Sequence, residues 1–118
     1  MKLAIGADHG GYPLKETLKG HLQSLGYEVV DCGTNSTDSV DYPDFARRVG
    51  VTLRDGLAEA GVLICGSGAG VSIAANKIRG VRAALCNDEL TAQISRRHND
   101  ANVLCLAADV VGEEMIRR

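Results

Sequence analysis

The chain has 118 residues, of which 45% are hydrophobic but only 3% aromatic, and its formal net charge is −2. This length and composition predict one domain with a core of Val, Ile, Leu and Ala side chains. The small negative charge argues against nucleic acid as the main partner. The chain lacks an apolar run of roughly 18 residues and a signal-peptide pattern, so we expect no membrane-spanning segment and a cytoplasmic protein.

Hydrophobic periodicity along the chain alternates between two kinds of segment. Short apolar runs predict parallel strands, and apolar residues at intervals of three or four predict amphipathic helices. In chain order the pattern predicts a strand over 2–7, a helix from Pro13 to Gly26, a strand over 28–32, a loop over 33–42, a helix from Pro43, a strand over 62–64, a helix over 71–77, a strand over 81–86, a helix from Asn87 or Asp88 to about Arg97, a turn over 98–101, a strand over 102–107 and a last helix opening near Asp109.

Alternation of strands and helices predicts an α/β fold of the three-layer α/β/α, Rossmann-like kind, with a five-stranded parallel sheet and helices on both faces. Ligands in such folds lie beyond the carboxyl ends of the strands. The apolar positions that we expect to face the sheet are, helix by helix, Leu14, Leu18, Leu22 and Leu25, then Phe45, Val49, Leu53 and Leu57, and then Leu90 and Ile94.

A glycine-rich segment joins the third predicted strand to its helix. Gly66, Gly68 and Gly70 allow the backbone to turn sharply and to approach a ligand closely. Amides at a helix N-terminus bind anions, and Cys65 ends the strand beside them, where a thiolate is stabilised. Glycine-rich turns also occur without a ligand, and buried cysteines are mostly inert, so the segment alone leaves a structural interpretation open.

The predicted topology also places three further polar residues. Asp8 and His9 follow the first strand, so they share the sheet edge with Cys65. His98 precedes the last strand, which puts it at the opposite edge, roughly 15 Å away at about 3.3 Å per residue. Either a symmetric second copy brings its own His98 to the cysteine edge, or His98 is simply a cation at a helix C-terminus.

The cysteines predict neither a zinc site nor a thioredoxin-like site. Cys32, Cys65, Cys86 and Cys105 include no C-x-x-C pair, and we expect free thiols. A nucleotide site is also disfavoured, because the glycine segment lacks the pattern G-x-x-x-x-G-K-[ST].

Four segments in order carry a resemblance to a known family. They are 7–15, 41–44, 64–77 and 95–102, with the patterns A-D-H-G-G-Y-x-L-K, D-Y-P-D, I-C-G-S-G-x-G-x-S-I-A-A-N-K and S-R-x-H-N-D-A-N. Together they are similar to the ribose-5-phosphate isomerase B / galactose-6-phosphate isomerase family, over Met1 to about Gly112. The resemblance implies one sugar-phosphate isomerase domain over 1–118, without the family's C-terminal tail.

The activity implied by the resemblance is aldose–ketose isomerisation without metal or cofactor, above all of ribose 5-phosphate and ribulose 5-phosphate in the pentose phosphate pathway. It also implies a homodimer or tetramer with sites at the subunit interface. Cys65 would be the base that moves the proton between C1 and C2, since Val71 stands where other members carry a glutamate base. His98 would open the sugar ring as an acid, and Ser67 would hydrogen-bond near the reacting carbons. The sugar would be bound by Asp8, His9, Gly66, Gly68, Ala69, Gly70 and Asn99.

Two departures from the family pattern lie near the C-terminus. Asp109 stands where members carry a phosphate-binding arginine, and an aspartate would repel phosphate. Family members also continue beyond the position of Arg118. Two alternatives follow from these departures: a non-catalytic or partner-dependent subunit that binds sugar phosphate, and an isomerase of unphosphorylated aldoses such as allose.

Overall fold

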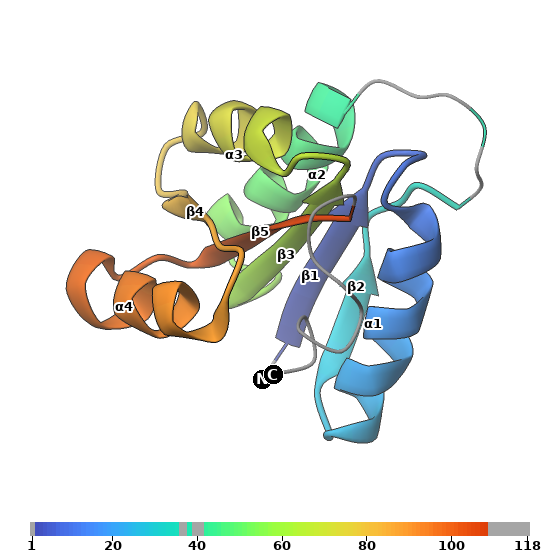
Figure 1. The fold of residues 1–118 in the computed structure, drawn as a ribbon, viewed down its shortest axis with the longest axis horizontal. Coiled ribbons are helices and arrows are strands. Elements are labelled where there is room, and N and C mark those ends of the chain that lie inside the picture. Colours follow the sequence, from blue (N-terminus) through green and yellow to red (C-terminus); the bar gives the residue numbers. More distant parts are fainter. Residues whose placement is uncertain (1, 36–37, 39–41, 109–118) are drawn as a thin grey trace.

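Five parallel strands form one sheet in the order β2-β1-β3-β5-β4, as Figure 1 shows. The computed structural model describes residues 2–35, 38 and 42–108. The predicted five-stranded parallel sheet is therefore confirmed, whereas the helix predicted from Asp109 lies outside the described residues. The strands are β1 (Lys2–Ala7), β2 (Glu28–Asp31), β3 (Ala60–Cys65), β4 (Ala83–Leu85) and β5 (Val103–Ala107).

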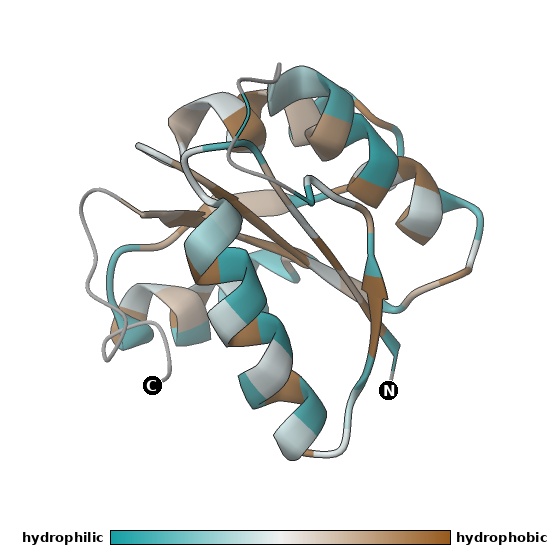
Figure 2. Ribbon diagram, turned by 90° about the vertical axis from the view of Figure 1, so that its right-hand side faces the viewer, coloured by the Kyte–Doolittle hydropathy of each residue, from teal (hydrophilic) through white to brown (hydrophobic). Residues whose placement is uncertain are grey.

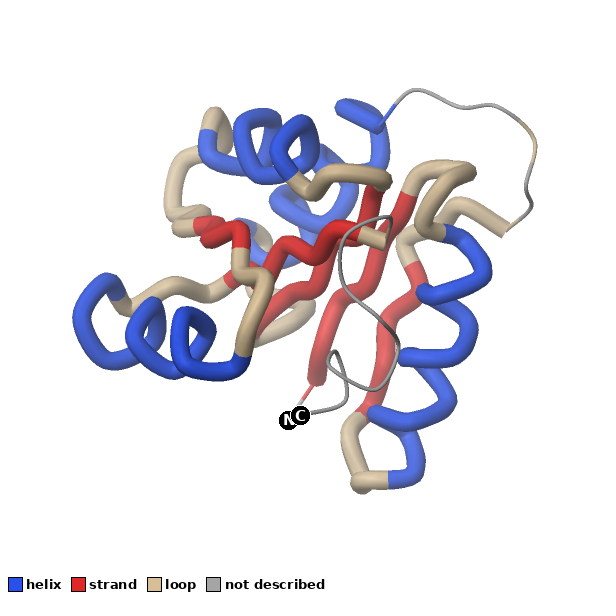
Figure 3. Tube along the Cα trace, viewed as in Figure 1, coloured by secondary structure: helices blue, strands red, loops and turns tan. Residues whose placement is uncertain are grey.

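Helices cover both faces of the sheet, as predicted, and Figure 3 shows the resulting layers. Helices α2 and α3 pack on one face, and α1 and α4 lie on the other. No helix within the described ranges is long and apolar enough to cross a membrane. The helices are α1 (Tyr12–Ser24), α2 (Tyr42–Arg54), α3 (Ala69–Asn76) and α4 (Glu89–Asn99).

The central strand β3 is buried on both of its faces. Leu63 and Cys65 belong to the cluster beneath α2 and α3, and Val62 and Ile64 to the cluster beneath α1. This is why the strand reads as a continuous apolar run rather than as an alternating one. Figure 2 shows the apolar strands in brown at the centre of the molecule. Burying one such aliphatic side chain contributes about 1.5–3 kcal/mol.

Two leucines that were predicted to extend a buried helical face lie in solvent. Leu57 is 62% exposed and Leu25 is 60% exposed. Each follows its helix rather than belonging to it, because the chain leaves through a glycine with positive φ, +75° at Gly56 and +94° at Gly26. The apolar spacing of three or four residues thus continues in the sequence beyond the end of each helix.

The predicted buried face of α4 was also wrong. Leu90 is 63% exposed and Ile94 is 43% exposed, whereas Ser95 is only 8% exposed. Ser95 is the buried residue of α4, and Ala92 and Ser95 line a cavity together with Leu104 of β5. This arrangement turns the larger apolar residues of α4 outward.

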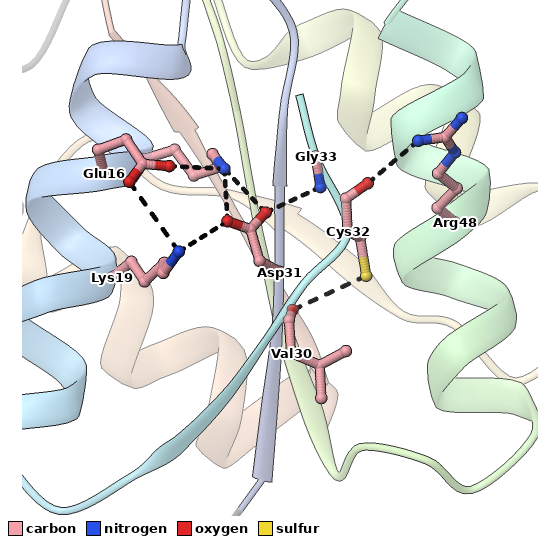
Figure 4. A network of polar contacts seen from close by, with 8 residues as sticks. Glu16, Lys19, Val30, Asp31, Cys32, Gly33 and Arg48 are labelled. Atoms are coloured by element: carbon pink, nitrogen blue, oxygen red, sulfur yellow. Dashed lines mark hydrogen bonds and ion pairs between the residues drawn. The ribbon is translucent and has the colours of Figure 1, made fainter. Parts of the chain in front are cut away.

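A buried lysine joins α1 to β2. Lys15 is completely buried, and its Nζ lies 2.8 Å from both carboxylate oxygens of Asp31 and 2.9 Å from Oε1 of Glu16. Figure 4 shows Asp31 at the centre of this network, which Lys19 and the Gly33 N–H also reach, at 3.0 and 2.9 Å. A buried charge is tolerated only when it is paired and hydrogen-bonded, so the network fixes where α1 lies on the sheet.

Replacing Lys15 by Met should lower the free energy of unfolding by about 3 kcal/mol, because Asp31 then loses its buried partner. The measurement is urea unfolding at neutral pH. Lys19→Met is the matched control: Lys19 contacts the same carboxylate but is 29% exposed, so we expect a loss below about 1 kcal/mol. Equal losses in the two variants would contradict this account.

The same network predicts a pH dependence of stability. Partial burial of Asp31 opposes ionisation, but hydrogen bonds from Lys15, the Gly33 N–H and Lys19 outweigh it and lower the pKa of Asp31 below its usual value. The stabilisation is therefore present above the unfolded-state pKa of about 3.9 and is lost as the pH falls through the folded-state pKa. Asp31→Asn should melt below the unsubstituted chain at neutral pH, and thermal melts should show the gap closing in acid. A gap that does not change with pH would refute this assignment.

Candidate active site

The turn after β1 is packed directly against the end of β3. The Asp8 N–H donates to the carbonyl oxygen of Ile64 at 3.2 Å, and Asp8 Oδ1 accepts the Gly11 N–H at 3.0 Å. A Cβ on Gly11 would lie 2.5 Å from the same Ile64 oxygen, so only glycine fits there. This close approach fixes the Asp8 carboxylate beside the strand that carries Cys65.

The glycine segment after β3 closes over the Cys65 thiol. Cys65 is 5% exposed, and its Sγ accepts the Gly68 N–H at 3.2 Å. Gly68 has a φ of +77°, and a Cβ there would lie 2.4 Å from Cδ1 of Leu85 and 3.2 Å from the carbonyl oxygen of Leu106. Both the backbone conformation and the space therefore require glycine, and α3 begins at the next residue.

The sheet register brings the first two predicted groups to one edge. Ala7 pairs with Ile64, so the residues that follow β1 and β3 emerge side by side. A Cβ on Gly10 would lie 3.9 Å from the amide nitrogen of Gly66. The predicted juxtaposition of the Asp8–His9 turn with the Cys65–Gly70 segment is thus observed.

Two side chains lie beside the glycine segment. The exposed Ser67 accepts the Ala69 N–H on its Oγ at 3.3 Å. The Tyr42 ring, at the start of α2, covers Gly70 so closely that a Cβ there would lie 2.8 Å from the ring. Sequence reasoning gave Tyr42 no role, and its only signal was its place in the D-Y-P-D segment.

His98 and Asn99 lie away from this edge. They are the last two residues of α4, whose chain then leads into the N-terminal end of β5. The Asp88 carboxylate caps the start of the helix by accepting the Thr91 N–H at 2.6 Å, and Asp100 ends it with a φ of +49°. Both side chains are exposed, and the fold does not bring them to Cys65 within one subunit.

Three further cysteines lie outside the glycine segment. Burial raises the pKa of Cys105 to about 12, and burial also raises the pKa values of Cys32 and Cys86. These thiols stay protonated near neutral pH. The described ranges contain no group of three or more His, Cys, Asp or Glu side chains placed to hold a metal ion.

Comparison with known proteins gives consistent matches over nearly the whole chain. The ribose/galactose isomerase family profile matches residues 3–118. Ribose-5-phosphate isomerase B of Escherichia coli K12 is 47% identical over 98% of this chain and 78% of that protein. D-erythrulose-4-phosphate isomerase of Pectobacterium atrosepticum is 40% identical over 99% of this chain and 78% of that protein.

Solved structures agree with the fold in detail. Clostridium thermocellum ribose-5-phosphate isomerase B superimposes with a TM-score of 0.97 at 50% identity, over 98% of this chain and 78% of that one. The Mycoplasma genitalium ribose-5-phosphate isomerase B with bound ribulose 5-phosphate gives 0.93 at 42% identity, again over 98% and 78%. The chain belongs to the ribose/galactose isomerase family, and it is an isomerase of the ribose-5-phosphate isomerase type. The resemblance found in the sequence is confirmed.

Substituting Gly68 by Ala should damage the site, because a side chain there costs about 1–2 kcal/mol in backbone strain and also displaces Leu85 or the end of β5. We expect a lower melting temperature and a large loss of turnover. Gly20→Ala is the control: Gly20 lies inside α1, where a Cβ meets no atom within 4 Å, so we expect stabilisation by about 0.5–1 kcal/mol. A Gly68→Ala variant with full activity and stability would show that the thiol site tolerates a different loop.

Proposed function

We propose that this isomerase interconverts ribose 5-phosphate and ribulose 5-phosphate through an enediolate, with Cys65 as the base and His98 as the ring-opening acid. The observation that carries the proposal is the Cys65 sulfur held at 3.2 Å from the Gly68 N–H, at the sheet edge shared with Asp8. The names of the relatives support the substrate class, and the Mycoplasma genitalium relative was solved with bound ribulose 5-phosphate.

The proton transfer needs a base beside the substrate's α-carbon. Cys65 lies at the N-terminal end of α3, where backbone N–H groups stabilise negative charge on sulfur. The thiolate would take the proton from C2 of the aldose and return it to C1, while the proton on the C2 hydroxyl moves to the C1 oxygen. The enediolate oxygens would face the amides of 66–70, and such donors contribute about 3 kcal/mol each in other enzymes.

Substrate binding would use groups from the same edge. Asp8 Oδ1 is held by the Gly11 N–H, which leaves the second carboxylate oxygen as an acceptor for a sugar hydroxyl. His9, Ser67, Ala69 and Asn99 would supply the remaining polar contacts to the sugar. The Tyr42 ring over Gly70 would bound the site on the α2 side.

Ring opening would require a second copy of the chain. His98 is exposed at the opposite sheet edge, so its imidazole would serve the Cys65 of a partner subunit. A homodimer, or a tetramer made of such dimers, would then contain two sites for each pair of subunits, each built from both chains.

The test is an isomerase assay with ribose 5-phosphate, alongside the size of the oligomer in the same sample. Cys65→Ala should lower kcat by about 10²–10⁴-fold, the range of general acid–base catalysis. Cys32→Ala is the matched control, because burial keeps that thiol protonated, and it should retain turnover.

Full activity in Cys65→Ala would reject the thiol base. A folded dimer that is inactive on ribose 5-phosphate but converts erythrulose 4-phosphate, the substrate named for the Pectobacterium atrosepticum relative, would reject the proposed sugar. Activity on unphosphorylated allose would reject the phosphate requirement.

A further inference from the structure

We propose that Arg82 and Asn102 are positioning residues for His98 and Asn99, because together they fix the last turn of α4 through which these two side chains would reach a second copy of the chain. The inference rests on the proposed function, in which His98 acts in a site of the partner subunit. Neither Arg82 nor Asn102 would touch the sugar.

Arg82 holds the residue that ends α4. Its Nε donates to the carbonyl oxygen of Asp100 at 2.7 Å, and Nη2 lies 3.5 Å from Oδ2 of the same residue. Asp100 has a φ of +49°, in the left-handed region where a residue other than glycine persists only if its surroundings hold it. The guanidinium contacts both the main chain and the side chain of Asp100, which the single ammonium group of a lysine could not do in the same geometry.

Asn102 ties the following turn to two other segments. Its Oδ1 accepts the Arg82 N–H at 2.8 Å, and its Nδ2 donates to the carbonyl oxygen of Gly80 at 2.9 Å. Its own N–H donates to the Arg82 carbonyl at 2.9 Å, and its carbonyl accepts the Gly61 N–H at 2.8 Å. The turn is thereby anchored to β3 and to the segment that enters β4.

The backbone and the side chains of this helix end are held very differently. The Ala101 N–H donates to the carbonyl oxygen of Ser95 at 3.0 Å, which closes the last turn of the helix. His98 and Asn99 are exposed, and within the described part of the chain neither side chain makes a hydrogen bond or ion pair. A site that is completed by another subunit requires a fixed main chain whose side chains are free to bind there. Misplacing a catalytic group by about 1 Å can cost 10²-fold in rate.

Mixed oligomers can test whether a variant damages the Cys65 part or the His98 part of the site. Cys65→Ala and His98→Ala should each be inactive alone. Dissociated, mixed in equal amounts and reassembled, they should recover about a quarter of the unsubstituted activity, because half of the dimers are mixed and each has one intact site.

Arg82→Met should lose about 10- to 100-fold in kcat. Mixed with Cys65→Ala, it should recover activity, because the Cys65→Ala chain supplies a correctly placed His98. Mixed with His98→Ala, it should not recover, because both chains are defective in the same part of the site. Asn102→Asp, which loses the donor to Gly80, should behave in the same way.

Arg97→Met is the matched control. Arg97 precedes His98 in the same helical turn, carries the same charge as Arg82 and makes no hydrogen bond or ion pair within the described part of the chain. It should keep full activity, so a loss in Arg82→Met is not explained by the removal of positive charge near His98. Thermal melts of every variant accompany the assays.

Three outcomes would overturn the inference. Full activity in Arg82→Met and Asn102→Asp would show that the contacts of these two residues have no role in positioning His98. Suppose that Cys65→Ala and His98→Ala restore each other's activity, but Arg82→Met regains activity with neither of them. Arg82→Met would then have a general structural defect, and the proposed function would stand. Failure of Cys65→Ala and His98→Ala to recover each other would reject the shared site itself, and the positioning role with it.

Discussion

The parallel register of β3 between β1 and β5 determines where every candidate group lies. Ala7 is paired with Ile64, and Cys65 with Ala107, so the carboxyl ends of these strands reach one sheet edge together. Strand pairing alone therefore brings the Asp8 turn and the glycine segment together at this edge. The same polarity sends the end of α4 to the other edge, so His98 cannot join Cys65 in the same subunit. The proposed chemistry therefore implies a second copy of the chain as a direct consequence of strand direction.

The buried Lys15–Asp31 pair links this register to the Asp8 turn. The main-chain N–H of Lys15 donates to the carbonyl oxygen of Gly11 at 2.8 Å, and Gly11 ends the turn that carries Asp8. Asp31 accepts the Gly33 N–H, and the Gly33 carbonyl accepts the Ala7 N–H at 2.7 Å. One ion pair thus fixes both the start of α1 and the strand end that precedes Asp8. It lies outside the site but restrains the backbone on both sides of Asp8.

Hydrophobic periodicity was enough to predict the succession of strands and helices along the chain, the layers and the sheet edge that carries Cys65. Burial of an element on one or both faces determines where its apolar residues recur in the sequence. Periodicity failed at Leu90 and Ile94, because the larger apolar residues of α4 are exposed while the small polar Ser95 is buried. It also gave no sign that Lys15 would be buried, because its partner is sixteen residues away in the chain. The position of the Tyr42 ring over Gly70 likewise depends on a contact between two helices, which no local pattern encodes.

The two parts of the proposed site are held by different physics. The cysteine part is fixed by exclusion: Gly11 and Gly68 lie where any Cβ would collide with the ends of neighbouring strands. The histidine part is fixed by polar contacts around Asp100, on a surface where side chains such as Arg82 are half exposed. Steric exclusion is indifferent to salt, whereas exposed ion pairs weaken as salt is added. Because Arg82 also donates directly to the main-chain carbonyl of Asp100, it keeps a contact that salt screens less. The exposed part of the proposed site can therefore stay in one conformation before the proposed partner subunit binds.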